Sequence, residues 1–280
     1  MVDLVGCDFS SSPSRRKCIV IAVGTLSGER VQLSKLERLS DLETFASWLQ
    51  QPRDWIGGFD LPFGLPRELV KSLGWPVQWE ACVRHFASLD RASIRAAFSQ
   101  FCNSRPVGSK FAHRATDALA GSSPSMKWVN PPVTFMLHAG LPRLLDAGIY
   151  LPGLMPPPVE HPDRAGLRVG VEAYPAMLAR EVLARRSYKS DDRSRQTADR
   201  LIARKDLLTS LELGHTRLHL RLALTNALRD VLLEDGSADS LDAVLCMMQA
   251  GWAAVQHAQG HTCYGLPQEM DSLEGWIVSA

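Results

Sequence analysis

Residues 239–253, DSLDAVLCMMQAGWA, place two carboxylates in a segment that otherwise has the composition of a buried helix. Between Leu241 and Met248 the only polar side chain is that of Asp242. A helix that is apolar on nearly every side belongs in a protein core, where an ionised carboxylate is costly unless it is paired or binds a metal. Asp239 lies three residues before Asp242, so we expect both carboxylates on one face of the helix.

A purely structural role is the alternative for these two acids. Ser237 could cap the helix while Asp239 and Asp242 complement the positive end of its dipole. This interpretation explains Asp239, but Asp242 falls more than one turn inside the helix. We therefore favour a functional role for the pair, which requires other carboxylates to meet it.

Length and composition limit the possible functions. The chain has 280 residues, 45% of them hydrophobic, which suits one large domain or a domain with a sizeable insertion. A formal net charge of +1 means that any anion-binding surface must be local. The six cysteines form no C-x-x-C pair, and no signal peptide or long apolar run is present. We expect a soluble cytoplasmic protein with no membrane association, of unknown oligomeric state.

Three segments near the N-terminus predict strands. Residues 2–8 form a short apolar run that ends in Asp8, and residues 18–24 (CIVIAVG) form a β-branched run. Residues 30–36 alternate polar and apolar side chains, which suits a strand near a sheet edge. The Ser-rich turn at residues 10–14 should join the first two strands as a hairpin.

A helix and a fourth strand follow. Ser40 and Glu43 make a capping box at the start of the helix, and residues 55–59 (WIGGF) have strand character, with Asp60 directly after them. A helix between two strands implies a crossover that lays the fourth strand parallel beside the first. Asp8 and Asp60 would then stand side by side at the carboxyl ends of neighbouring strands, where α/β sheets bind ligands.

Residues 61–165 are predicted to be a mostly helical insertion. Its helices should cover residues 78–88, 90–103 and 134–147. A loop at residues 104–132 lies between them, and the proline-rich residues 150–166 predict a stiff connector. The predicted sheet domain consists of residues 1–60 and 166–280.

A fifth strand and a basic segment complete the pattern. Residues 167–171 (LRVGV) have strand character, and Glu172 follows directly. Residues 188–205 are rich in Arg and Lys, including Lys189 and Arg195. Helices are predicted over residues 193–213 and 216–233, and the terminal EGWIV could add an edge strand. Acids are interleaved in the basic segment, so an ordinary solvated helix face is the alternative to an anion-binding surface.

Five acids could therefore converge. Asp8, Asp60 and Glu172 each follow a predicted strand, and Asp239 and Asp242 begin the helix that must pack on that sheet. Hard oxygen ligands from separated positions are what Mg²⁺ or Mn²⁺ requires, above all for two ions about 3.5–4 Å apart. Taken singly, each acid could be a turn former or a helix cap, so the prediction depends on the sheet order.

The segments that carry these acids resemble a known family. GCDFS, GGFDLPFGLP, VGVEAYP, the late helix and the terminal EGWIV are similar to the family described as domain of unknown function 429, a predicted RNase H-like nuclease. The order of strand-Asp, hairpin, crossover, strand-Asp and late D-x-x-D helix also resembles the RNase H-like superfamily, and the final helix is similar to that of its Holliday-junction resolvases. The resemblance spans nearly the whole chain. It implies an α/β fold with a five-stranded mixed sheet, strand order 3-2-1-4-5, flanked by helices.

The resemblance also implies roles for the acids. Asp8 would bridge two Mg²⁺ or Mn²⁺ ions, Asp60 would hold one of them, and Asp239 or Asp242 the other, with Glu172 as a further catalytic acid. The implied activity is a nuclease that hydrolyses phosphodiester bonds in DNA or RNA by a two-metal mechanism.

Nucleic acid is accordingly the expected partner. Candidate contacts to its backbone are Ser10, Lys110, Arg114, Lys127, Lys189 and Arg195. Phe9 departs from the family pattern, because many relatives have a small residue there, and its bulk should narrow the cleft.

Two other functions fit the same residues. Asp8 with the serines at residues 10–12 could hold a phosphate in a nucleotide-binding phosphotransferase of the related actin-like fold. That fold has two glycine-rich phosphate loops and a duplicated sheet. This sequence has only one acidic strand end of that kind and no second glycine-rich turn after a later strand. A non-catalytic RNase H-like binding scaffold is the other alternative, although all of the acids are retained.

Overall fold

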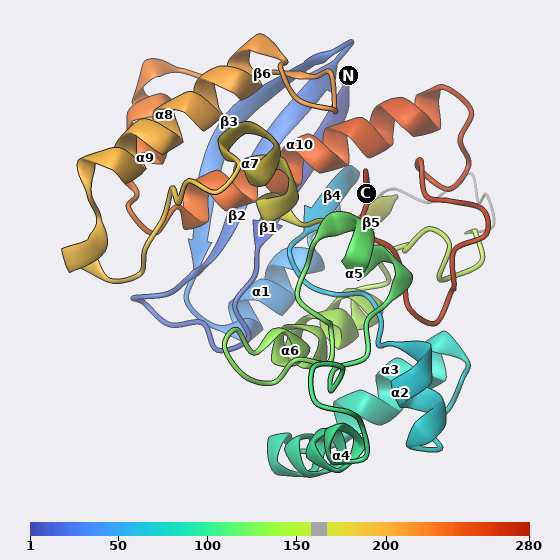
Figure 1. Cartoon of the computed structure of the whole chain (residues 1–280). Coiled ribbons are helices and arrows are strands. Elements are labelled where there is room, and N and C mark those ends of the chain that lie inside the picture. The colour runs from blue at the N-terminus through green and yellow to red at the C-terminus, as the bar shows by residue number, and fades with distance from the viewer. Residues whose placement is uncertain (158–166) are drawn as a thin grey trace.

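Apolar runs with β-branched residues build one mixed sheet at the centre of the molecule (Figure 1). The structure is a computed structural model that describes residues 1–157 and 167–280. Its strands are β1 (Val2–Asp8), β2 (Ile19–Ser27), β3 (Arg30–Leu39), β4 (Trp55–Phe59), β5 (Arg168–Glu172) and β6 (Arg221–Ala223). They lie in the order β5-β4-β1-β2-β3-β6. The predicted α/β class, a mixed sheet flanked by helices, is confirmed.

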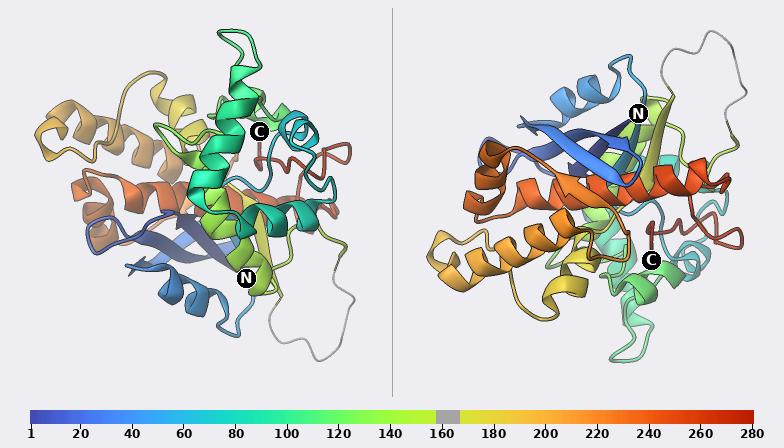
Figure 2. Two further views of the ribbon diagram at one scale, coloured as in Figure 1. Left: turned by 90° about the horizontal axis from the view of Figure 1, so that it is seen from below. Right: turned by 90° about the horizontal axis from the view of Figure 1, so that it is seen from above.

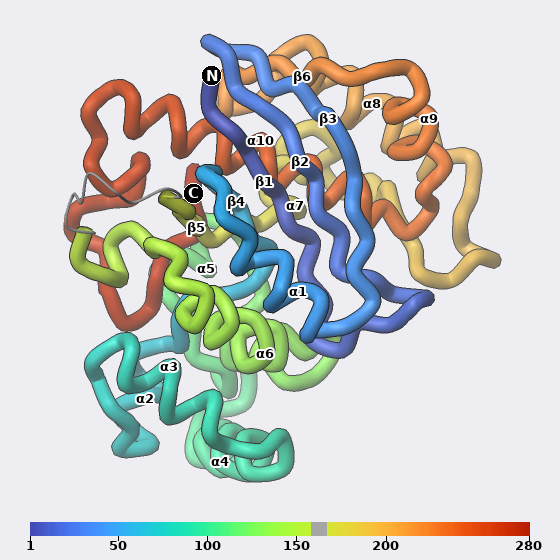
Figure 3. Tube along the Cα trace, turned by 180° about the vertical axis from the view of Figure 1, so that it is seen from behind, coloured from blue at the N-terminus to red at the C-terminus, as the bar shows by residue number. Residues whose placement is uncertain are grey.

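Helices cover both faces of this sheet (Figure 2). They are α1 (Leu42–Leu49), α2 (Arg67–Ser72), α3 (Trp79–Ser88), α4 (Arg91–Asn103), α5 (Ala115–Ala120), α6 (Val133–Asp146), α7 (Pro175–Leu183), α8 (Ala198–Leu213), α9 (Asn226–Glu234) and α10 (Asp239–Ala258), with a short 3₁₀ turn, Arg193–Arg195. Helix α10 packs across β1, β4 and β2, while α1 and α6 cover the other face (Figure 3). Within the described part of the chain, no helix has the length and apolar character needed to cross a membrane.

The sheet and the helices of the predicted insertion share a core. One cluster of buried residues joins Cys7 of β1 and Phe59 of β4 to Phe86 of α3, Phe98 of α4 and Leu141 of α6. The insertion thus packs on the sheet face that α10 leaves uncovered. Its predicted end, at residue 165, lies outside the described residues, and the division into two parts stays a prediction.

The helix predicted over residues 216–233 is wrong in its first half. Leu218, Leu220 and Leu222 are buried, and each alternates with an exposed residue, which is the period of a strand. This segment supplies β6, which pairs with the outer edge of β3, and the helix itself begins only at Asn226. The prediction of a continuous helix missed the short period-two pattern. The helix predicted from residue 193 likewise starts late, at Ala198.

Smaller corrections concern the ends of elements. Asp41, and not Ser40, caps α1: its Oδ1 accepts a hydrogen bond of 2.7 Å from the backbone N–H of Thr44. The predicted loop at residues 104–132 contains helix α5, and the terminal EGWIV forms a single bridge from Ile277 to Glu172 instead of a strand.

Two glycines let α10 approach the sheet at backbone contact. A Cβ atom on Gly6 of β1 would lie 2.0 Å from the carbonyl oxygen of Ala243, and one on Gly58 of β4 would lie 2.3 Å from that of Cys246. Side chains alternate between the faces of a strand, so Asp8 and Asp60, two residues after these glycines, share the face that carries α10.

Candidate functional site

Asp8 and Asp60 stand beside each other at the carboxyl ends of two parallel strands. Cys7 of β1 is in register with Phe59 of β4, and the N–H of Asp60 donates to the carbonyl of Cys7 at 2.9 Å. Both carboxylates are half-buried. The sheet therefore brings these two predicted site residues together.

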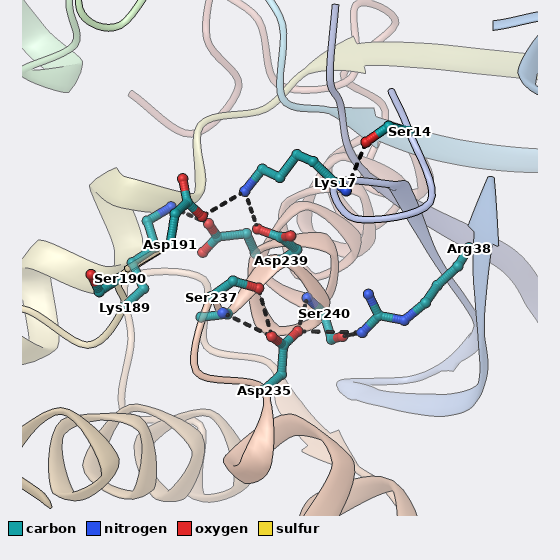
Figure 4. Close-up of polar contacts among 12 residues, drawn as sticks. Ser14, Lys17, Arg38, Lys189, Ser190, Asp191, Asp235, Ser237, Asp239 and Ser240 are labelled. Carbon is teal, nitrogen blue, oxygen red and sulfur yellow. Dashed lines mark hydrogen bonds and ion pairs between the residues drawn. The ribbon is translucent and has the colours of Figure 1, made fainter. Parts of the chain in front are cut away.

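Asp239 and Asp242 reach the same place from the first turn of α10. Both are buried, with Asp239 5% exposed and Asp242 fully covered. Neither caps the helix, and Ser237 does not cap it either: Asp235 accepts from the N–H groups of Ala238 at 3.2 Å and Ser240 at 2.9 Å (Figure 4). Ser237 is therefore wrong as the predicted cap. Asp242, expected more than one turn inside the helix, lies in the first turn with Asp239, where both charges complement the helix dipole.

The four aspartates repel one another. Burial, together with the charges of Asp242, Asp60 and Asp239, raises the pKa of Asp8 well above its ordinary value. Burial and the charge of Asp242 raise the pKa of Asp60 to about 7. We call Asp8, Asp60, Asp239 and Asp242 the aspartate cluster.

Two lysines partly neutralise the aspartate cluster. Lys17, in the loop between β1 and β2, donates to Asp239 at 2.7 Å and to Asp191 at 3.0 Å (Figure 4). Lys189 donates to Asp242, whose other oxygen accepts from the Tyr188 hydroxyl at 2.5 Å. Burial lowers the pKa of each lysine, but the paired aspartate outweighs it, so both pKa values are raised.

When all of these groups are ionised, four carboxylates against two ammonium groups leave a surplus of negative charge. That donor set has the oxygen chemistry of a Mg²⁺ or Mn²⁺ site. As the side chains stand, however, no three His, Cys, Asp or Glu residues among 1–157 and 167–280 form a group that could hold a metal ion. Asp239 and Asp242 pair with Lys17 and Lys189 instead, and each lysine side chain is 43% exposed. The residues fit a cation by their chemistry, but both aspartates would have to release their lysines to ligate it.

Several residues at this site escaped the sequence analysis. Lys17 belongs to the basic RRK turn of the first hairpin, whose sequence could have suggested a charge partner. Tyr188 is held by the buried guanidinium of Arg204, which donates to its carbonyl at 2.8 Å and to that of Leu233 at 2.9 Å. Arg204 therefore anchors the segment that carries Lys189.

Glu172 is not a member of the aspartate cluster, although its charge helps to raise the pKa of Asp60 and both residues line one cavity. It pairs in register with Phe59, so its side chain leaves the sheet on the face opposite α10. There Arg114 donates to both of its oxygens, at 2.6 and 2.8 Å, and the N–H of Phe63 donates to it at 2.8 Å. Arg114 also pairs with Asp117. Buried ion pairs occupy Glu172 and Arg114, and both residues also line a cavity beside Asp60. Their roles as catalytic acid and substrate contact stay predictions.

We expect Arg114→Met to cost about 3–5 kcal/mol of unfolding free energy, because it leaves two buried carboxylates without a cation. Denaturant unfolding measures this loss. A suitable comparison is Arg84→Met, whose pair with Asp146 has side chains 45% and 60% exposed and should contribute about 1 kcal/mol or less. Equal losses for the two variants would contradict the structural role given to Arg114.

The remaining predicted substrate contacts fall into two groups. Lys189, like Arg114, lines a cavity of about 230 Å³ beside Asp60, and Ser10 lies two residues after Asp8 at the end of β1. Lys110 and Arg195 are exposed and Lys127 is half-buried. These last three line neither that cavity nor a larger hollow of about 640 Å³ beside Asp239. The larger hollow is bordered by three basic residues and four acids: Arg16, Lys17, Arg193, Asp191, Glu234, Asp235 and Asp239.

The metal-free protein should lose stability as the pH rises from about 4 to about 7. The pKa of Asp60 is raised from 3.8 to about 7, so the unfolded chain releases this proton first. Across that window the folded state binds more protons, and stability falls with rising pH. Denaturant unfolding in EDTA at both ends of the window should show a smaller fall for Asp60→Asn than for the wild type. An identical fall in the free energy of unfolding would show that Asp60 does not have a raised pKa in the folded state.

No protein-family model matches this chain, and neither a curated protein nor a solved structure does. The resemblance to domain of unknown function 429 and to the RNase H-like superfamily therefore stays a prediction based on the motifs quoted above.

Proposed function

We propose that the protein is a divalent-cation-dependent hydrolase of phosphodiester bonds in nucleic acid, built on an RNase H-like sheet. The observation that carries this proposal is the adjacency of Asp8 and Asp60 at neighbouring strand ends, with Asp239 and Asp242 of α10 close enough for their charges to raise the pKa of Asp8. The neighbours β3-β2-β1-β4-β5 also follow the order 3-2-1-4-5 that the resemblance implies, with β6 added at the edge.

Asp8, Asp60 and Asp242 would hold the cation, with Asp239 beside them. Mg²⁺ or Mn²⁺ would activate the attacking water and stabilise charge on the leaving oxygen. The carboxylates of the aspartate cluster supply the negative charge that attracts a cation to the site. Lys189 and Lys17, once released from Asp242 and Asp239, are placed to pair with phosphate oxygens of the substrate.

Three basic residues of the larger hollow offer contacts to a polyanionic substrate, although Asp191, Glu234, Asp235 and Asp239 line it too. Arg16, Lys17 and Arg193 border it, and Asp239 of the cluster lines the same hollow. Phosphate contacts of this kind give affinity without sequence preference. A nucleic-acid backbone lying here would pass directly beside the aspartate cluster.

A non-catalytic scaffold is the second candidate, because both lysines already pair with cluster carboxylates. In that case the ion pairs would be permanent and the acids purely structural. The actin-like phosphotransferase gains no support, since the described residues form one undivided sheet.

The test is a cleavage assay with purified protein, Mn²⁺ or Mg²⁺, and labelled single-stranded, duplex, hybrid and branched nucleic acids. We expect cleavage that EDTA abolishes and added Mn²⁺ restores. Cleavage of none of these substrates with either ion would favour the scaffold and overturn the proposal.

A further inference from the structure

The cavity beside Asp60 has a character of its own. It measures about 230 Å³ and lies where the carboxyl ends of β4 and β5 meet the loops around α5 and α6. Its walls include Leu61, Pro62, Pro131, Met136 and Ile277. Polar residues also line it, namely Asp60, Ser122, Ser123, Tyr174, Lys189 and the Arg114–Glu172 ion pair. Mostly apolar walls with a few placed polar groups are typical of a site for a small organic group.

We propose that this cavity takes one unpaired nucleobase with its sugar, so that the substrate is single-stranded nucleic acid. The inference rests on the proposed hydrolase function and specifies its substrate. Asp60 is a member of the aspartate cluster and Lys189 pairs with Asp242 of the cluster, and both residues line the cavity. A base bound in the cavity would therefore bring its adjoining phosphate to the cluster.

The dimensions and lining of the cavity fit this occupant. A hollow of about 230 Å³ accommodates one nucleoside, whereas a duplex is too wide to enter it. Apolar walls suit the faces of a base, and Tyr174 adds an aromatic surface of the kind on which unpaired bases stack. Its ring is held in place by Arg180, whose guanidinium lies 5.2 Å from the ring centre and donates to the carbonyl of Ala120 at 2.6 Å.

The two hollows flank the aspartate cluster. The cavity reaches it at Asp60, and the larger hollow, which acidic and basic residues line, reaches it at Asp239. A strand with one base in the cavity could continue its phosphates past the cluster towards Lys17 and Arg193. Apolar walls in the cavity suit a base, and these two cations in the larger hollow offer contacts to the backbone.

The first experiment measures binding of the four ribonucleoside 5′-monophosphates by calorimetry, with Ca²⁺ present. Met136→Trp fills the cavity, and Leu119→Trp, at a position 66% exposed on neighbouring α5, is the matched control. We expect at least one nucleotide to bind the wild type, at least tenfold weaker binding to Met136→Trp, and binding to Leu119→Trp within twofold of wild type. Val133→Trp, which also lines the cavity, replaces Met136→Trp if circular dichroism shows that the latter does not fold.

The second experiment compares cleavage of a single strand and of its duplex, where we expect at least a tenfold preference for the single strand. Nucleotide binding that Met136→Trp abolishes, without cleavage of any substrate, would support the cavity and refute the hydrolase. Equal cleavage of both forms, with Met136→Trp as active as Leu119→Trp, would refute the cavity and leave the hydrolase standing. Absence of both binding and cleavage would refute both.

Discussion

Asp8→Asn should lower phosphodiester cleavage at saturating Mn²⁺ by about 10³-fold or more. The charges of the three other cluster aspartates all raise the pKa of Asp8, so Asp8 lies close to each of them. Asparagine has the same shape but no charge. Bound cations stabilise the transition state by several kcal/mol, and about 1.4 kcal/mol corresponds to a tenfold change in rate.

The same substitution should not destabilise the protein. Removing one of several repelling, half-buried carboxylates relieves repulsion, so we expect the free energy of unfolding in EDTA to stay equal or to rise. Asp3→Asn, on the exposed start of the same strand, is the control and should retain wild-type activity. Full activity of Asp8→Asn would remove Asp8 from the mechanism, and an activity loss matched by unfolding would make its role structural.

Gly6→Ala should destabilise the protein by at least about 3 kcal/mol. Its Cβ would meet the carbonyl oxygen of Ala243 at 2.0 Å and the N atom of Met247 at 2.2 Å, both of them backbone atoms of α10. Side-chain rotation cannot relieve contacts with backbone, so the helix must move away from β1. This movement would also separate Asp242 from Asp8, and cation binding should weaken with stability.

Denaturant unfolding of Gly6→Ala and Gly28→Ala separates this clash from the general effect of replacing glycine. Gly28 has a φ of +58° with no atom within 4 Å of a Cβ, so only its backbone strain contributes, about 1–2 kcal/mol. If Gly6→Ala proves no more destabilising than Gly28→Ala, the close approach of α10 to β1 is incorrect.

The sequence sufficed to predict the pairing of Asp8 with Asp60. Two apolar runs each ended by an acid, and the crossover helix between them required parallel neighbours. The apolar composition of residues 239–253 likewise predicted a buried helix with its acids near the sheet, because only a core position suits such a helix. These features depend on local periodicity and on general rules of topology.

Glu172 shows where such reasoning fails. Asp60 comes one residue after Phe59, whereas Glu172 is in register with Phe59, so the two acids leave opposite faces of the sheet. The sequence shows that each acid follows a strand but does not fix the register between β4 and β5. The partner of Glu172 could not be predicted either, since Arg114 comes from the insertion and lies 58 residues away.

The lysines were beyond prediction for a related reason. Lys17 precedes Asp239 by 222 residues, and only the packing of the first hairpin against the start of α10 brings them together. Lys189 was predicted as a substrate contact but pairs with Asp242 in the folded chain. Lys189 can contact a substrate only if a cation displaces it from Asp242.

Titration of Mn²⁺ into the metal-free protein, followed by calorimetry, tests most directly whether the aspartate cluster is a cation site. The wild type should bind Mn²⁺ and release protons as it does so, because binding favours the ionised forms of Asp8 and Asp60. Asp242→Asn should bind at least tenfold more weakly. Absence of Mn²⁺ binding to the wild type, or equal binding to Asp242→Asn, would contradict the account.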